Sequence, residues 1–425
     1  MTTLIVLVII LMAIMGAPVF IVLSAFAMLG FYMTGIPLAA IIVDIYSNFS
    51  SQPLLYTIPL FTFAGYILAE SKTSIRLVNF SRAIIGWLPG GLAIVALVTC
   101  AFFTAFTGAS GVTIIALGGL LYPAMIKEKY PENFSLGLLT SSGSLGLLFP
   151  PSLPIILFGV VSEASINQLF AAGLLPGIFL IMLLSLYSMF IGKRGGVVQT
   201  KFHFAEVLKT ANQAKWELFI PVIVVVGIYG GFFTLGEIAS ITVAYALIIE
   251  VFIQKDIRIS QIPSIMKRSM ILVGGILVIL GAAYGLTNYL IDAEIPMLIL
   301  DFMQSYITSK VVFLLTLNIF LLIVGCVLDI FSAILVTVPL ILPIAESYGI
   351  NPVHLGIIFL TNLEIGYSTP PVGMNLFIAS FRFNKSVLTL YRSTIPFLII
   401  LFIALMFITY MPQLSLWLVD YLHIK

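Results

Sequence analysis

The chain has 425 residues, of which 61% are hydrophobic and 8% are charged, and its mean hydropathy is +1.20. This composition excludes an ordinary soluble domain and indicates a polytopic membrane protein. A net charge of +2 gives no reason to expect a nucleic-acid partner. The three histidines are scattered and the two cysteines lie in apolar segments, so we expect no transition-metal site and no cofactor.

The first half of the chain contains three features besides ordinary apolar spans. A stretch of mixed apolar and polar residues predicts an amphipathic arm helix in the membrane interface. The next apolar stretch is too long for one crossing and lacks a polar loop for two, which favours a re-entrant hairpin; one tilted helix with an interfacial tail is the alternative. The third feature is a helix broken by two prolines, which remove backbone donors. Within residues 1–191 these are the arm helix 71–88, the hairpin 90–125 with a turn near Gly108–Gly111, and the broken helix 134–160.

The second half repeats this order after a charged stretch, 192–216, which we interpret as a cytoplasmic linker. Residues 217–425 contain an arm helix 291–309, a hairpin 311–345 with a turn near Gly325–Asp329, and a broken helix 352–380. The second break runs from Gly366 to Asn375 and also contains two consecutive prolines. Carbonyls freed at membrane depth need partners from protein or water, because lipid supplies none.

A constant offset of 220 positions relates the two halves. Gly146, Pro150 and Pro151 of the first break correspond in this way to Gly366, Pro370 and Pro371 of the second. The stretch 70–86 is basic whereas its counterpart 291–310 is mostly acidic, which predicts opposite topologies for the two halves. Inverted repeats with broken helices are typical of carriers that work by alternating access around a midplane site. We therefore predict an all-α polytopic transporter fold with two inverted repeats and alternating access.

Positive charge is predicted to gather on one face of the membrane. All but two of the 19 basic residues fall in loops assigned to the same side, and the exceptions are Lys310 and Lys425. The basic loops are therefore predicted to be cytoplasmic. This places the amino terminus outside if residues 2–15 and 17–34 cross the membrane separately.

Oxygen-bearing residues cluster at both hairpin turns and at both breaks, where they suit sodium, a hard cation that prefers oxygen ligands. Free N–H groups at the ends of half-helices suit a carboxylate. The alternative for each serine or threonine is a hydrogen bond to its own preceding turn. The residues concerned are Thr107, Gly108, Ser110, Thr113, Ser142, Ser144 and Ser152 in the first half, and Gly325, Asp329, Ser332, Thr361, Ser368, Thr369 and Asn375 in the second.

Two acids lie within apolar segments, where an ionisable group is costly and usually faces protein or water. Asp329 at the second hairpin turn could accept a proton, bind sodium, or cap the helix that follows at Ser332. We favour the cap, because aspartate is a preferred N-cap residue. Glu364 directly precedes the second break, which suggests a place near the cytoplasmic vestibule.

Several motifs resemble those of one family, the large membrane subunit of the tripartite ATP-independent periplasmic (TRAP) transporters. The most specific runs from Asn362 to Phe377 and reads Asn-Leu-Glu-Ile-Gly-Tyr-Ser-Thr-Pro-Pro-Val-Gly-Met-Asn-Leu-Phe. The runs Gly325–Asp329, Gly349–Gly356 and Gly227–Thr234 fit the same family, so the resemblance covers nearly the whole chain.

The resemblance implies an elevator-type, multi-pass protein of the bacterial inner membrane that imports an organic acid, such as a C4-dicarboxylate or sialic acid, with sodium. The expected partners are a periplasmic substrate-binding protein, a small membrane subunit of about four helices, and membrane lipid. The predicted sodium site comprises Gly108, Ser110, Thr113, Gly146, Pro150, Gly325, Asp329, Gly366, Thr369 and Met374. The predicted substrate site comprises Ser110, Ser152, Ser332, Thr361 and Asn375.

Other functions fit the sequence less well. A stand-alone sodium/dicarboxylate carrier would share the repeats and the breaks, and only the motif resemblance argues against it. A channel would need a continuous polar lining. A metalloprotease would need the pattern His-Glu-x-x-His, and an ATP-driven pump would need a Gly-x-x-x-x-Gly-Lys-Ser/Thr loop; the sequence contains neither. We therefore expect a secondary transporter subunit and not an enzyme.

Overall fold

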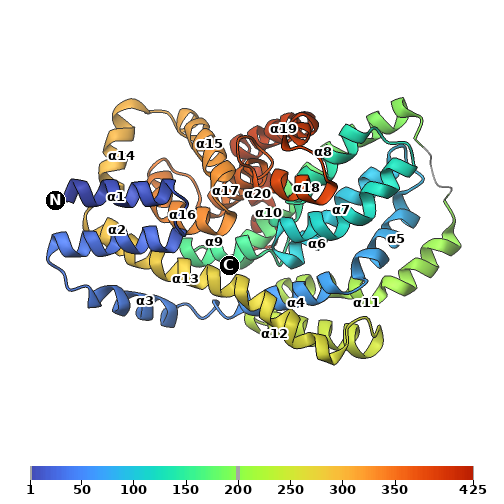
Figure 1. The fold of residues 1–425 in the computed structure, drawn as a ribbon, viewed down its shortest axis with the longest axis horizontal. Coiled ribbons are helices and arrows are strands. Elements are labelled where there is room, and N and C mark those ends of the chain that lie inside the picture. The colour runs from blue at the N-terminus through green and yellow to red at the C-terminus, as the bar shows by residue number, and fades with distance from the viewer. Residues whose placement is uncertain (1, 198–201, 425) are drawn as a thin grey trace.

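The computed structural model describes residues 2–197 and 202–424, and every regular element in these ranges is helical (Figure 1). Eight of the described helices are long and apolar enough to cross a membrane. A ninth candidate is the pair of segments Glu132–Leu148 and Leu153–Ser162, which meet at a bend of 46°. The prediction of an all-helical polytopic membrane protein is confirmed.

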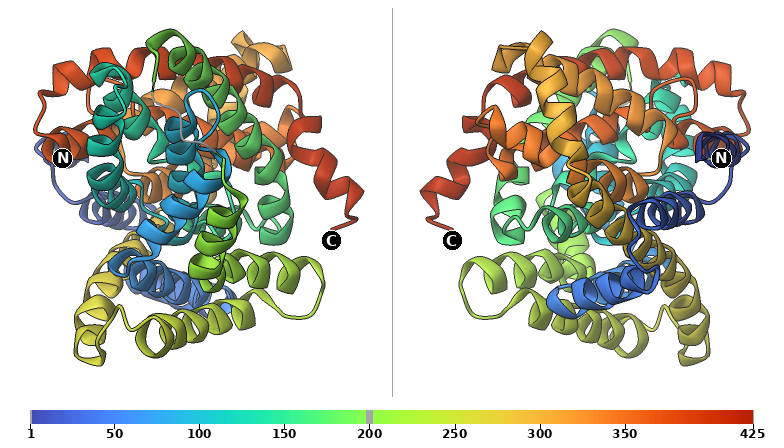
Figure 2. Two further views of the ribbon diagram at one scale, coloured as in Figure 1. Left: turned by 90° about the vertical axis from the view of Figure 1, so that its right-hand side faces the viewer. Right: turned by 90° about the vertical axis from the view of Figure 1, so that its left-hand side faces the viewer.

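One group of helices gathers along the lower edge of the molecule in Figure 1 and forms a separate layer in Figure 2. It consists of α3 (Ala39–Ser51), α4 (Thr57–Glu70), α11 (Phe204–Tyr229), α12 (Leu235–Leu247) with the π-helical turn Ile248–Ile253, and α13 (Ile262–Asp292), which a short 3-10 turn Ile259–Gln261 precedes. Helices α1 (Thr2–Ile14) and α2 (Val19–Thr34) pack on each other, and α2 packs on α13. Helix α3 was not predicted, because its many polar residues hide it from a search for apolar spans.

The remaining helices form the larger group, in which the predicted hairpins and breaks appear as helix pairs. The hairpins are α6 (Gly91–Thr107) with α7 (Ser110–Lys127) and α15 (Lys310–Val327) with α16 (Ile330–Ser347). The broken helices are α8 (Glu132–Ser142), η1 (Leu145–Leu148) and α9 (Leu153–Ser162), and α17 (Pro352–Gly366) with α18 (Met374–Phe383). Helices α10 (Ile166–Gly195), α19 (Val387–Tyr410) and α20 (Gln413–Tyr421) follow the breaks. That the hairpins re-enter from one face of a membrane stays a prediction.

The offset of 220 positions reappears in the helix boundaries. Helix α7 begins at Ser110 and α16 at Ile330, while α8 begins at Glu132 and α17 at Pro352. The contacts recur in the same way, because α7 packs on α18 and α16 packs on α9, and α8 packs on α19 as α17 packs on α10. Each half thus packs its hairpin against the helix that follows the break in the other half. The opposite orientation of the halves in a membrane stays a prediction.

The two predicted arm helices, α5 (Thr73–Ile85) and α14 (Ile295–Tyr306), lie at opposite ends of the molecule (Figure 1). Helix α5 is fixed by Arg76, which pairs with Glu217 of α11 at 2.5 Å, Glu250 of the π-helical turn at 3.2 Å and Asp256 at 2.6 Å. Burial alone would lower the pKa of Arg76, but the hydrogen bond to Asp256 and the three acidic charges raise it. Arg76 is therefore charged, and it holds α5 against the first group of helices.

The predicted linker 192–216 is in large part helical. Helix α10 continues to Gly195 and α11 begins at Phe204, so the connection between them is short. Positions 198–201 of the predicted linker lie outside the described residues. The first turns of α11 are rich in lysine, glutamine and asparagine, which is why a hydropathy criterion assigned them to a loop.

A buried polar network joins three helices of the second half to α20. Asn362 of α17 donates to Asn318 Oδ1 of α15 at 2.7 Å, and Asn318 donates to Thr409 Oγ1 of α19 at 3.1 Å. The ring of His354 lies 3.2 Å from Ser415 Oγ of α20 and 3.3 Å from the Thr409 carbonyl oxygen. Because a buried polar group without a partner is costly, this network fixes the relative positions of the helices.

Candidate functional site

The glycine at each break lies against the backbone of the neighbouring hairpin. A Cβ atom on Gly146 would lie 2.5 Å from the Ala105 amide nitrogen, and one on Gly366 would lie 2.6 Å from the Gly325 carbonyl carbon. Positions 105 and 325 are themselves related by the offset of 220. Both breaks therefore pack on the first helix of their own hairpin at a distance that only glycine permits.

In the first half, threonine hydroxyls join the hairpin to the break. Thr113 of α7 and Thr104 of α6 share a hydrogen bond of 2.6 Å between their hydroxyl oxygens, and Thr104 donates to the Gly143 carbonyl at 2.7 Å. The turn between α6 and α7 needs Gly108, whose φ of 64° is in the left-handed region. A Cβ on Gly108 would contact the Leu153 side chain at the start of α9, so the turn lies beside the break.

In the second half, Asp329 caps α16. Its carboxylate accepts hydrogen bonds from the amides of Phe331 at 3.1 Å and Ser332 at 3.0 Å, and also from the Ser332 hydroxyl. This geometry confirms the helix cap that we favoured. The hairpin and the break are joined here too, because the Ile330 amide donates to the Tyr367 hydroxyl and the Gly373 amide donates to the Cys326 carbonyl at 3.0 Å.

The two halves meet at their breaks. The Ser144 hydroxyl donates to the Glu364 carbonyl oxygen at 3.3 Å, and these residues occupy equivalent positions 220 apart. The amide of Asn375 donates to the Thr140 carbonyl and the Ser144 hydroxyl at 3.4 Å each, and to the Ser368 hydroxyl at 3.5 Å. Equivalent residues of the two halves thus contact each other in this cluster.

Several buried polar atoms in this region have no hydrogen-bond partner among the described residues. They are the hydroxyls of Ser142 and Ser152, the side-chain carbonyl oxygen of Asn375 and both carboxylate oxygens of Glu364. Glu364 is 1% exposed, so its side chain lies in the protein interior and not in a vestibule as we expected. Buried polar atoms are normally paired, so these oxygens fit a cation that prefers oxygen ligands or a polar substrate.

The two breaks differ in their exposure. Pro150, Pro151 and Ser152 of the first break are buried, whereas Pro370 and Pro371 of the second are exposed. Both Pro-Pro peptide bonds are cis. The second break thus reaches the surface of the protein while the first is enclosed.

Most of the predicted site residues lie at the two turns and breaks, but Thr369 of the second break bonds the helix before it, as Thr361 inside α17 does. The hydroxyls of Thr361 and Thr369 donate to carbonyls four residues earlier, Ile357 and Ile365, at 2.7 and 2.8 Å. Met374 is 42% exposed. At the turns and breaks lie Gly108, Ser110, Thr113, Gly146, Pro150, Ser152, Gly325, Asp329, Ser332, Gly366 and Asn375. No measurement yet tests which of these residues bind a ligand, so the assignment stays a prediction.

Sequence reasoning missed three residues that build this region. Thr104 lies inside an apolar helix, and no local pattern distinguishes it from a threonine that bonds its own turn. The Thr140 hydroxyl does bond its own turn, at the Leu136 carbonyl, and Thr140 contributes only its backbone carbonyl to the cluster. Tyr367 could have been found, since it follows Gly366 in the second break, where a hydroxyl able to reach the hairpin was to be expected.

Comparison with known proteins gives a consistent result. Residues 4–414 match the family described as "Tripartite ATP-independent periplasmic transporter, DctM component". The chain is 34% identical over 374 residues to the C4-dicarboxylate TRAP transporter large permease protein DctM of Pseudomonas aeruginosa, with 88% of each protein covered. It is 33% identical over 408 residues to the isethionate TRAP transporter permease protein DctMQ of Oleidesulfovibrio alaskensis, a match that covers 95% of this chain and spans 64% of that relative's length. The YdaH transporter of Alcanivorax borkumensis is similar in fold, with a TM-score of 0.63, 12% identity and 88% of each chain covered.

Proposed function

This chain belongs to the DctM component of the tripartite ATP-independent periplasmic transporters, and on that premise we propose that it imports a carboxylate-bearing organic acid together with sodium. It is a transporter subunit and not an enzyme. A small membrane subunit assembles with it, and a periplasmic binding protein delivers the substrate to it for import across the bacterial inner membrane. Its relatives carry the names of different substrates, such as C4-dicarboxylate and isethionate. The identity of the acid therefore depends on the binding protein as well as on this chain.

One observation carries the proposal, namely that the two broken helices meet at Ser144 and Glu364. Helices α9 and α18 begin directly after the breaks, where the positive ends of the helix dipoles suit a negatively charged group. The unpartnered oxygens of Ser152 and Asn375 lie at these same helix starts. Sodium and a carboxylate can thus share one site, in which the positive ion partly neutralises the acid.

For the mechanism, we propose that the hairpins and broken helices move as one unit against α3, α4 and α11–α13. The mutual packing of α7 on α18 and of α16 on α9 supports a single moving body. The exposed second break and the enclosed first break are what alternating access requires, since only one side of the site is open at a time. The fixation of α5 by Arg76 supports its role as a brace of the stationary part.

The test is uptake of radiolabelled organic acids into proteoliposomes that contain this chain and its small subunit. A sodium gradient and the binding protein are each present in one sample and absent in another. Uptake that needs both supports the proposal, whereas sodium-driven uptake without the binding protein would instead indicate a stand-alone carrier. If the rate of uptake did not depend on sodium when the binding protein and its cognate acid were both present, the proposed coupling of transport to sodium would be refuted.

Site residues are tested in the same vesicles. We expect Asn375→Ala to abolish uptake, because its amide joins the two halves through Thr140 and Ser144. The sequence predicts the same loss for Thr369→Ala, whose hydroxyl donates to the Ile365 carbonyl in this structure. Normal uptake by Thr369→Ala would show that this hydroxyl serves only its own helix. Ser305→Ala is a matched control, since this exposed hydroxyl of α14 bonds only its own helix at 2.6 Å. Normal uptake by Asn375→Ala at normal membrane insertion would remove this residue from the site.

A further inference from the structure

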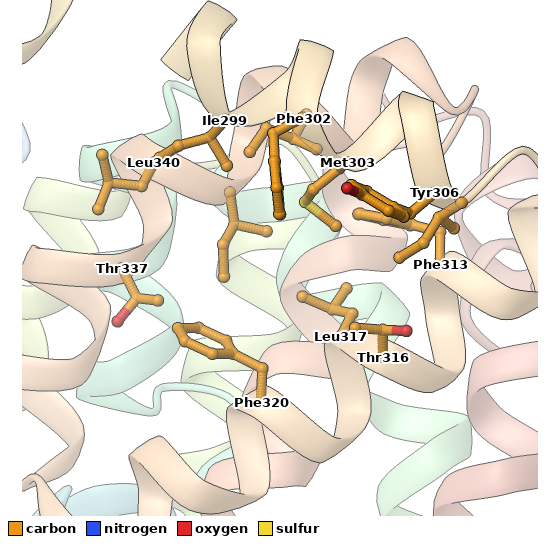
Figure 3. Close-up of a pocket in the computed structure, with 13 residues that line it drawn as sticks. Ile299, Phe302, Met303, Tyr306, Phe313, Thr316, Leu317, Phe320, Thr337 and Leu340 are labelled. Atoms are coloured by element: carbon orange, nitrogen blue, oxygen red, sulfur yellow. The ribbon is translucent and has the colours of Figure 1, made fainter. Parts of the chain in front are cut away.

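An apolar cavity of about 630 Å³ lies between the second arm helix, α14, and the second hairpin, α15 and α16. Phe302 and Met303 of α14 point into it from one side and Phe320 of α15 from the other (Figure 3). Leu340 and Thr337 of α16 close it at the end away from Tyr306. None of the residues that line this cavity is assigned to the transport site.

Water does not suit this cavity. Of its thirteen lining residues, only Tyr306, Thr316 and Thr337 carry a polar side-chain atom. A buried water needs two to four polar partners, and cavities lined by apolar side chains stay dry and take up apolar molecules instead. The occupant must therefore be apolar.

A helix from another protein is too large. One turn of a helix with its side chains fills roughly 400–600 Å³, given a diameter of about 10–12 Å and a pitch of 5.4 Å. The cavity of about 630 Å³ thus holds little more than one turn, whereas a spanning helix has between five and six. A narrow, flexible hydrocarbon chain fits this volume, whereas a helix does not.

The cavity opens to an exposed apolar surface. Phe302 and Phe320 are 67% and 46% exposed, and the apolar residues Ile319 and Ile323 continue the same exposed surface along α15. Within α14, which is described in full, the buried residues are Pro296 and Leu300 alone, so the helix is loosely packed. In a membrane, the molecules that reach such an opening are lipids with long hydrocarbon tails.

The two arm helices differ in how they pack on their hairpins. Helix α5 packs directly along α6, the first helix of its own hairpin. Helix α14 packs on α13 and α16, and the cavity lies between it and α15. The second arm therefore packs on α16 but lacks the close packing on the first helix of its hairpin, α15, that α5 has on α6.

We propose that one acyl tail of a bilayer phospholipid fills this cavity and completes the packing of α14 against the hairpin. The tail enters between Phe302 and Phe320, and its end contacts Leu340. The headgroup stays at the interface, where the amphipathic helix α14 is predicted to lie. The bound tail replaces the side-chain contacts that α5 makes with α6.

The experiment uses the complex of this chain and its small subunit in vesicles of phosphatidylethanolamine and phosphatidylglycerol. A trace of phosphatidylethanolamine that carries a diazirine in one acyl tail is photolysed, and labelled peptides are mapped by mass spectrometry. We expect labels on residues of α14, α15 and α16 that line the cavity. Leu340→Trp, which fills the cavity, is expected to lower this labelling several-fold, whereas Ile323→Trp on the exposed face of α15 leaves it unchanged.

A second measurement does not depend on either variant. Adding the same phospholipids to the delipidated wild-type complex is expected to raise its Tm, and the rise is expected to be smaller in Leu340→Trp. Labels spread evenly over all apolar surfaces of the wild type would overturn the proposal. So would labelling that the small subunit blocks, which would identify a protein partner, or preferential labelling by a diazirine fatty acid, which would identify a free fatty acid.

Discussion

The close contact between Gly366 and the second hairpin leads to a sharp prediction for Gly366→Ala. The new Cβ would lie 2.6 Å from the Gly325 carbonyl carbon, whereas ordinary contacts begin at 3.4 Å, so one backbone must move by at least 0.8 Å. Overpacking of this kind typically costs about 1–3 kcal/mol. At 1.4 kcal/mol per tenfold, that cost changes an equilibrium roughly 5- to 150-fold. Because the contact joins the hairpin to the break, the change falls on the site itself.

The assay for this variant is sodium-driven uptake with the binding protein present, together with Tm in detergent. We expect a lower Tm and a loss of most uptake, while membrane insertion is unchanged. Gly274→Ala in α13 is the control, because a Cβ there meets nothing within 4 Å. This control measures the increase in stability, up to about 1 kcal/mol, that results from replacing glycine by alanine inside a helix. Wild-type uptake and Tm in Gly366→Ala would contradict the argument that the break packs on the hairpin.

Three further predictions concern buried charges and hydrogen bonds. Arg76→Leu removes the partner of Glu217 and its neighbours, so we expect a loss of about 3–5 kcal/mol, measured by chemical denaturation, with a smaller loss for Arg76→Lys; an unchanged stability would show that the cluster does not fix α5. Asp329→Asn preserves the cap, so we expect it to keep both the Tm and the half-saturating sodium concentration of uptake. Asp329→Ala removes the cap and is expected to lower the free energy of unfolding by about 0.5–2 kcal/mol. If Asp329→Asn raised the sodium concentration needed for uptake at a constant Tm, the carboxylate would instead be assigned to the ion. Asn318→Leu leaves buried partners unpaired, including Asn362, and is expected to lower stability by about 1–3 kcal/mol without changing the sodium dependence of uptake. A normal Tm in this variant would show that the network does not stabilise the fold.

Much of the architecture follows from local chemistry along the chain. Apolar composition determines the class of protein, and the Pro-Pro pairs after Gly146 and Gly366 determine where helices break, since proline lacks a donor wherever it stands. The cap at Asp329 was also predictable, because an N-cap depends on residues only two or three positions away. Helix α3 and the first turns of α11 were missed, because their polar residues resemble those of a loop when only hydropathy is considered.

The contacts that build the site were decided only by the tertiary structure. The hydroxyl of Ser144 meets the Glu364 carbonyl across 220 positions, and Arg76 reaches Glu250 across 174. No local periodicity encodes such pairs, because they depend on how whole helices pack, and a shift of one helical turn would separate them. The sequence alone determined that two breaks exist and that each contains polar groups. Only the packing of the hairpins brought the two breaks together into one site.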